Sequence, residues 1–194
     1  MPMFHNGNRE LQDAFGSRAL ADRLVERLRR SEFTDDDKSL IESLEYFFLA
    51  TADPVGRPDC SFKGGPPGFA RVIAPDLLVW PDYDGNGMFK SLGNIAVNPS
   101  VGLLFMRMGE APKRLRVNGV AMISLDDPLM DTFPGAQALV RLTPVDIFPN
   151  CPRYIPDPES QKASPYIPQK DQPPVEPKWK AMDMFSDVVP PRKA

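Results

Sequence analysis

Hydrophobic residues near the N-terminus recur every three or four positions, which is the spacing of one face of a helix. Between residues 8 and 30 the intervening positions are rich in arginine and glutamate, and the apolar positions are Leu11, Phe15, Leu20, Leu24 and Leu28. This pattern predicts one amphipathic helix, or two if the chain breaks near Gly16. A second helix is predicted to start at Thr34, whose hydroxyl precedes three aspartates, and to end before Phe47.

After the second helix the pattern changes to short apolar runs that are separated by turn residues. Residues 47–52 and 58–63 flank the sequence Asp-Pro-Val-Gly and predict a hairpin. Further strands are predicted at residues 69–73, 77–80, 101–106, 115–124 and 139–147. Many short strands with brief helical inserts favour an antiparallel barrel over a doubly wound parallel sheet, so we predict a mainly β, α+β fold.

Proline is concentrated near the C-terminus, where 12 of the 23 prolines lie between residues 144 and 191. Because proline fixes φ and removes a backbone donor, this segment is predicted to run extended, with disorder at residues 156–172 as the alternative. Its expected anchors are Tyr154, Tyr166, Trp179 and Phe185. The predicted division is a domain over residues 1–148, with the N-terminal helices, and a tail over residues 149–194 that packs on the domain or on a dimer partner.

Composition argues against several classes of function. A formal net charge of −3, with no basic run, disfavours a role with nucleic acid. We found neither a signal peptide pattern nor an apolar stretch long enough for a membrane span, so a cytoplasmic protein without membrane attachment is expected. Cys60 and Cys151 lie far apart with no histidine beside them, which favours free thiols over a disulfide framework and predicts no metal site.

The clearest candidate for a binding site lies between residues 81 and 99. A glycine-rich turn there leads into a short predicted helix with Lys90 and Ser91 near its start. Free backbone N–H groups and the positive end of the helix dipole attract an anion, and the adjacent ammonium and hydroxyl add to that attraction. The sequence therefore predicts a phosphate site at this turn.

Two further segments could face an anionic ligand. Strand alternation puts Arg114, Arg116 and Asn118 on one face, which suits a ligand groove but equally suits a solvated exterior. Ser61 and Lys63 form a similar pair just before a glycine-rich run at residues 64–68. That run allows close approach of a ligand to the backbone, and a plain loop explains it equally well.

A series of short motifs follows one another from about residue 45 to residue 124. The motifs are FLATAD at 48–53, GRP at 56–58, SFKG at 61–64, FKS at 89–91, NP at 98–99, VGLLF at 101–105 and RLRVNG at 114–119. In this order they resemble the FMN-binding split-barrel group of pyridoxamine 5'-phosphate oxidase-like proteins. The resemblance implies a six-stranded antiparallel split β-barrel and a homodimer with FMN at the subunit interface.

The resemblance also implies which residues hold the cofactor. Lys90 and Ser91 match the segment that holds the FMN phosphate, in agreement with the helix argument. Ser61, Phe62 and Lys63 match the strand that runs along the flavin, and Lys63 would be a second phosphate ligand.

Three more cofactor contacts follow from the resemblance. Arg114 stands where the oxidases usually carry a glutamine near the flavin, and it would place a positive charge beside the ring and favour the reduced, anionic flavin. Arg116 matches the arginine after that position. Trp179 matches a C-terminal tryptophan that stacks near the flavin, although anchoring of the tail explains it nearly as well.

The function implied is that of a flavin-dependent oxidoreductase acting on an unidentified small molecule, with a reduced substrate or a nicotinamide as electron donor. No catalytic residue is assigned, because the cofactor would carry the chemistry. The authentic oxidase uses a C-terminal Arg-x-His motif, and this chain has one histidine, His5, at the opposite end, so a typical pyridoxamine phosphate oxidase is not expected. The alternatives are a module that binds, stores or senses FMN, haem or another flavin, and a structural homodimer with an empty groove.

Overall fold

The chain divides into two compact units in the computed structural model, which describes residues 3–109, 111–158 and 175–190. The strand unit comprises Arg30–Pro152, and the helical unit comprises Met1–Arg29 together with Arg153–Ala194. The domain boundary at residues 148 and 149 stays a prediction.

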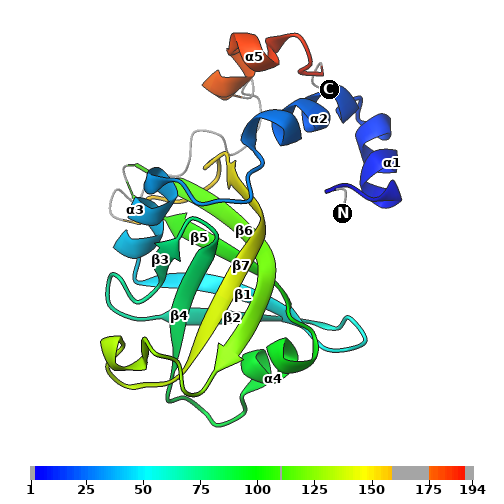
Figure 1. Ribbon diagram of the computed structural model, residues 1–194. Coiled ribbons are helices and arrows are strands. Elements are labelled where there is room, and N and C mark those ends of the chain that lie inside the picture. The colour runs from blue at the N-terminus through cyan, green and yellow to red at the C-terminus, as the bar shows by residue number, and fades with distance from the viewer. Residues whose placement is uncertain (1–2, 110, 159–174, 191–194) are drawn as a thin grey trace. The chain divides into compact units, whose positions relative to one another are not determined.

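The strand unit contains every strand that the sequence patterns predict, and two helices of at least eight residues. The elements are α3 (Asp35–Ser43), β1 (Tyr46–Ala52), β2 (Pro58–Gly64), β3 (Arg71–Ala74), β4 (Leu77–Tyr83), α4 (Lys90–Val97), β5 (Ser100–Arg107), β6 (Lys113–Ser124), the 3-10 turn η1 (Met130–Thr132) and β7 (Ala136–Asn150). In Figure 1 the helices α3 and α4 lie at opposite ends of the strands.

The strands form one antiparallel sheet in the order β2-β1-β5-β6-β7-β4-β3. The sheet curls around a core, because the rings of Phe47 on β1 and Trp80 on β4 lie 5.5 Å apart, although these strands are not neighbours. The mainly antiparallel β fold is therefore confirmed. The six-stranded barrel is not, since the sheet has seven strands and no strand pairing joins β2 to β3 or β4. We call this unjoined side the split.

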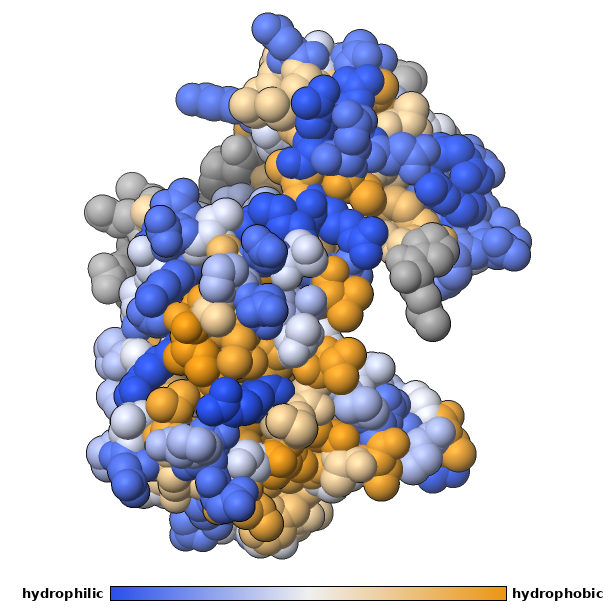
Figure 2. All heavy atoms as spheres, viewed as in Figure 1, coloured by the Kyte–Doolittle hydropathy of each residue, from blue (hydrophilic) through white to orange (hydrophobic). Residues whose placement is uncertain are grey.

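Alternation along β6 shows how the sequence pattern sets the two faces of the sheet. Leu115, Val117 and Ala121 are buried, whereas Arg116, Asn118 and Val120 are exposed. Gly119 continues the buried row at a bulge, where a Cβ atom would lie 2.4 Å from the carbonyl oxygen of Thr143. Hydrophobic side chains also reach the surface over the strand unit, among hydrophilic ones (Figure 2).

A buried ion pair fixes the connection between β6 and β7. Asp127 is 4% exposed and accepts hydrogen bonds from Arg141 Nε at 2.5 Å and Arg141 Nη2 at 2.8 Å. The backbone N–H of Leu129 donates to the same carboxylate at 2.9 Å. The hydrogen bonds from Arg141 hold the pKa of Asp127 below its ordinary value.

The cap predicted at the start of α3 is present. The Thr34 hydroxyl accepts a hydrogen bond from the backbone N–H of Asp37 at 3.2 Å, and the Asp37 carboxylate accepts one from the backbone N–H of Thr34 at 2.9 Å. These reciprocal bonds satisfy N–H groups that have no partner inside the helix.

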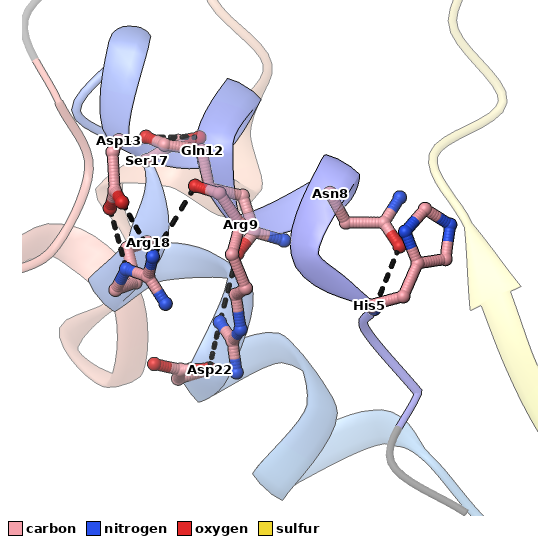
Figure 3. Close-up of polar contacts among 8 residues, drawn as sticks. All are labelled: His5, Asn8, Arg9, Gln12, Asp13, Ser17, Arg18 and Asp22. Carbon is pink, nitrogen blue, oxygen red and sulfur yellow. Dashed lines mark hydrogen bonds and ion pairs between the residues drawn. The ribbon is translucent and has the colours of Figure 1, made fainter.

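The helical unit begins with two helices, α1 (Asn6–Ala14) and α2 (Arg18–Leu28), so the break near Gly16 is confirmed. Gly16 has a φ of 63°, a left-handed conformation that suits glycine. Ion pairs tie the two helices together, as Figure 3 shows for Arg9 with Asp22 at 2.7 Å and Arg18 with Asp13.

The C-terminal part of the helical unit contains helical turns where the sequence predicts an extended tail. These are η2 (Lys178–Ala181) and α5 (Asp183–Ser186). The rings of Trp179 and Phe185 meet edge to face at 5.7 Å, which lets two aromatic side chains bury each other locally. Tyr166 and most of residues 156–172 lie outside the described residues. None of the described helices is both long and apolar enough to cross a membrane.

Candidate functional site

A pocket of about 480 Å³ lies at the split of the strand unit. Its walls come from β2, the end of β4, the turn that precedes α4, the first residues of α4, and Gln137 on β7. The candidate residues Ser61, Phe62, Lys63, Lys90 and Ser91 all line it. The structure therefore brings together two segments that are almost thirty residues apart in the chain.

Helix α4 is fixed to the sheet by residues that do not line the pocket. The Asn94 amide donates a 2.9 Å hydrogen bond to the Thr51 hydroxyl on β1, and both side chains are buried. Ile95 packs into the hydrophobic core beside them. A buried hydrogen bond and an apolar anchor one residue apart hold the start of α4 in place at the pocket wall.

The start of α4 has no side-chain cap. Phe89 occupies the N-cap position with a φ of 47°, and its side chain cannot accept a hydrogen bond from the first turn. The first N–H groups of a helix have no partner within it, so those of α4 remain available to a ligand. Lys90 and Ser91 line the pocket at this point, and Ser91 is only 6% exposed. An anion is favoured here by N–H groups, a hydroxyl and an ammonium together.

Lys63 reaches the pocket from the opposite side of the split. Its Nζ lies 3.8 Å from Oδ1 of Asp82, which belongs to β4. This ion pair crosses from one edge strand of the sheet to the strand next to the other edge. Both side chains are largely buried, at 19% and 14% exposure, so their charges are less screened than those of a surface pair.

A bulge in β7 positions Gln137 beside the ion pair of Lys63 and Asp82. Asp82 pairs with Ala138 and Tyr83 pairs with Ala136, which leaves Gln137 as the extra residue between them. The Gln137 amide donates to Oδ2 of Asp82 at 2.9 Å and to the carbonyl oxygen of Tyr83 at 3.2 Å. Sequence reasoning missed both Asp82 and Gln137. The only signal was that Asp82 directly precedes the glycine-rich turn.

The family model described as pyridoxamine 5'-phosphate oxidase matches residues 33–151, which is more than half of the chain and contains the whole pocket. The chain belongs to the pyridoxamine 5'-phosphate oxidase family. The family resemblance stated from the sequence is thereby confirmed. No curated protein matches the chain.

Several solved structures are similar to part of this pyridoxamine 5'-phosphate oxidase family member. HupZ of Group A Streptococcus is 18% identical, with 60% of this chain and 93% of that chain covered and a TM-score of 0.50. An FMN-binding protein from Syntrophomonas wolfei is 12% identical, with 75% and 95% covered and a TM-score of 0.48. HutZ, a haem storage protein from Vibrio cholerae, is 20% identical, with 61% and 95% covered and a TM-score of 0.44. At 18% identity, the likeness to HupZ concerns the fold alone.

Three of the residues that the family resemblance implies do not line the pocket. Arg114 on β6 donates from Nη2 to the carbonyl oxygen of Cys151 at 2.8 Å, and its Nε is buried without a partner. Arg116 is exposed two residues further along the same strand. Trp179 belongs to the helical unit, where it packs against Phe185.

Formal charges within the pocket cancel in this family member. Its positively charged lining residues are Lys63 and Lys90, and its negatively charged ones are Asp59 and Asp82. Attraction of an anion therefore depends on how these charges are arranged, and on the N–H groups of α4, rather than on an excess of positive charge.

Proposed function

We propose that the pocket binds the phosphate end of FMN and that the protein is a cytoplasmic, flavin-dependent oxidoreductase that acts on a small molecule. The observation that carries this proposal is the convergence of Lys63, Lys90 and the uncapped start of α4 on one pocket. This set of groups suits a phosphate, since a phosphate monoester offers several oxygens that can accept from an ammonium, a hydroxyl and backbone N–H groups at once. Membership of the family supports FMN as the ligand that carries this phosphate.

The residues present fit the rest of such a ligand as well. Phe62 is 63% exposed at the pocket wall and stacks on Tyr46 with 5.5 Å between ring centroids, so it offers an aromatic surface beside the phosphate groups. FMN supplies hydride and electron transfer when it is bound, and the protein needs to bind, orient and shield it. Lys90, Ser91 and α4 would hold the phosphate, and β2 would support the remainder.

We further propose that two copies of the chain pair through the outer face of β2, β1, β5 and β6. One row across this face contains, in order, Phe62, Phe48, Leu104 and Arg116. The aromatic rings of Tyr46, Phe48 and Phe62 lie within 5.5–6.1 Å of one another beside it. A contiguous apolar face on an exposed sheet favours association, and a twofold contact uses the same patch on both copies.

Pairing through this face would also explain why Arg114 and Arg116 do not line the pocket of their own chain. Arg116 stands three strands from Phe62 in the same row, roughly 14 Å at the usual strand spacing. It is therefore too far along the sheet to serve the pocket of its own chain. In a twofold pair, the β6 face of each copy would be carried toward the pocket of the other, and the homodimer would contain two composite flavin sites.

Leu104→Glu is expected to separate the proposed dimer, because it places a charge in the middle of the apolar row. Sedimentation or light scattering should give the mass of two chains for the wild type and of one chain for the variant, with weaker FMN binding. The matched control is Val55→Glu, since Val55 is an exposed apolar residue in the turn between β1 and β2. A wild-type monomer, or a variant that remains dimeric, would contradict the proposed interface.

Purified protein is expected to carry a yellow chromophore with a flavin absorption spectrum, and NADH, NADPH or a reduced substrate is expected to bleach it rapidly under anaerobic conditions. Stopped-flow absorption measures the bleaching and the return of colour with oxygen. Bound flavin that is reduced slowly or not at all would replace the oxidoreductase with a flavin-binding module. A haem spectrum, or a colourless protein that does not bind added FMN, would refute the flavin proposal.

A further inference from the structure

A carboxylate in the wall of a phosphate pocket needs an explanation, because it repels the ligand. Asp82 lies in the pocket wall beside Lys63, with its side chain 14% exposed. A surface carboxylate would be screened by water, whereas this one acts in a partly desolvated space. Its charge therefore bears directly on which anions the pocket accepts.

The contact between Lys63 and Asp82 is a charge interaction rather than a hydrogen bond. The distance of 3.8 Å from Nζ to Oδ1 exceeds the range of an N–H···O bond. Within the described part of the chain, no residue accepts a hydrogen bond from the Lys63 ammonium, so its three donors are available to a ligand. Asp82 thus lowers the positive potential of Lys63 without occupying its donors.

The position of Asp82 is fixed from behind by the β7 bulge. Gln137 donates to the second carboxylate oxygen at 2.9 Å, and the same amide donates to the backbone of Tyr83. Bulges commonly re-aim a side chain next to a functional site. The carboxylate is therefore held by protein on one oxygen and faces Lys63 with the other.

We propose that Asp82 is a specificity-determining residue that weakens the hold of the pocket on a bare phosphate, so that binding requires the rest of the ligand. This inference rests on the proposed function of the pocket as a phosphate site. With both lysines of the lining balanced formally by Asp59 and Asp82, the phosphate end alone meets no net positive charge. A ligand that also contacts the aromatic wall at Phe62 gains enough to bind, and free phosphate does not.

Asp82→Asn removes the charge and keeps an oxygen that can accept from Gln137. We expect the variant to bind FMN about tenfold more tightly and to bind riboflavin, which lacks the phosphate, with unchanged affinity. The inhibition constant of inorganic phosphate, obtained by competition and corrected for each protein's own FMN dissociation constant, should be about tenfold lower for the variant than for the wild type. Quenching of flavin fluorescence measures all three. The matched control, Asp76→Asn, removes an exposed carboxylate from the turn between β3 and β4 and should change none of them.

A double variant separates this role from a merely structural one. In a Lys63→Met background, Asp82→Asn should tighten FMN binding less than it does in the wild type, because the lysine whose charge Asp82 offsets has been removed. If the wild type binds FMN and Asp82→Asn binds it equally or more weakly, or if riboflavin affinity changes in parallel, the inference is wrong and the phosphate site stands. If neither wild type nor variant binds FMN, the proposed function fails and the inference fails with it.

Discussion

Lys90→Met is expected to weaken FMN binding by roughly tenfold to hundredfold. The substitution keeps most of the stem of the side chain and removes the ammonium that lines the pocket at the start of α4. A hydrogen bond to a charged group contributes about 1.5–3 kcal/mol, which corresponds to that loss of affinity. Titration of the apoprotein with FMN, followed by fluorescence quenching, measures the dissociation constant.

Riboflavin and a second lysine provide the controls for this result. Riboflavin binding should be the same in Lys90→Met and in the wild type, because the lost contact is to the phosphate. Lys38→Met should leave FMN binding unchanged, since Lys38 lies on α3, at the opposite end of the strands from α4 (Figure 1). An FMN dissociation constant for Lys90→Met equal to that of the wild type would show that the phosphate does not bind at α4.

Asp127→Asn is expected to lower the free energy of unfolding by about 2–3 kcal/mol at pH 7. The variant leaves the largely buried Arg141 guanidinium without a charged partner, and breaking such a pair is costly to the folded state. Urea unfolding measures the change. The matched control is Asp126→Asn, because Asp126 is the exposed neighbour and makes one weak contact, a 3.5 Å hydrogen bond from Ser124.

The effect of Asp127→Asn should depend on pH in a defined direction. Arg141 lowers the pKa of Asp127 in the folded protein, so the carboxylate stabilises the fold above the unfolded pKa of about 3.9, and this contribution is lost as the pH falls through the folded pKa. The difference between wild type and variant should therefore be constant from pH 7 to about pH 5 and shrink in more acidic solution. A difference that persists unchanged at pH 3 would mean that the ion pair does not stabilise the protein.

The sequence was sufficient to predict the elements that depend on local patterns. Alternation along β6 and the turn after β1 placed the strands, and the threonine cap placed the start of α3. The turn that we propose as the phosphate site was also visible, because glycines, a lysine and a serine follow one another within a few residues. These features depend on neighbours in the chain, so they can be read without knowledge of the fold.

The remainder depends on contacts between distant segments. The pairing of Lys63 with Asp82 exists because the sheet curls until β2 faces β4, and the role of Gln137 follows from a bulge that strand alternation does not predict. The local patterns predicted all seven strands, whereas the six-stranded barrel was implied by the family resemblance and is not confirmed. The position of the short strand β3 at the edge of an open sheet depends on its pairing with β4, which the local pattern does not show. Arg114 was assigned to the flavin, and in the single chain it holds Cys151.

The backbone of Phe89, at the pocket entrance, has a strained conformation. A non-glycine residue in the left-handed region costs about 1–2 kcal/mol, and this one carries a ring that is 52% exposed to water. Three glycines, Gly85, Gly87 and Gly93, stand within four residues of it, but position 89 itself, where glycine would adopt this conformation without strain, carries phenylalanine. Replacing this phenylalanine by glycine should therefore make the protein more resistant to heat. The same substitution would remove an aromatic ring from the rim of the pocket.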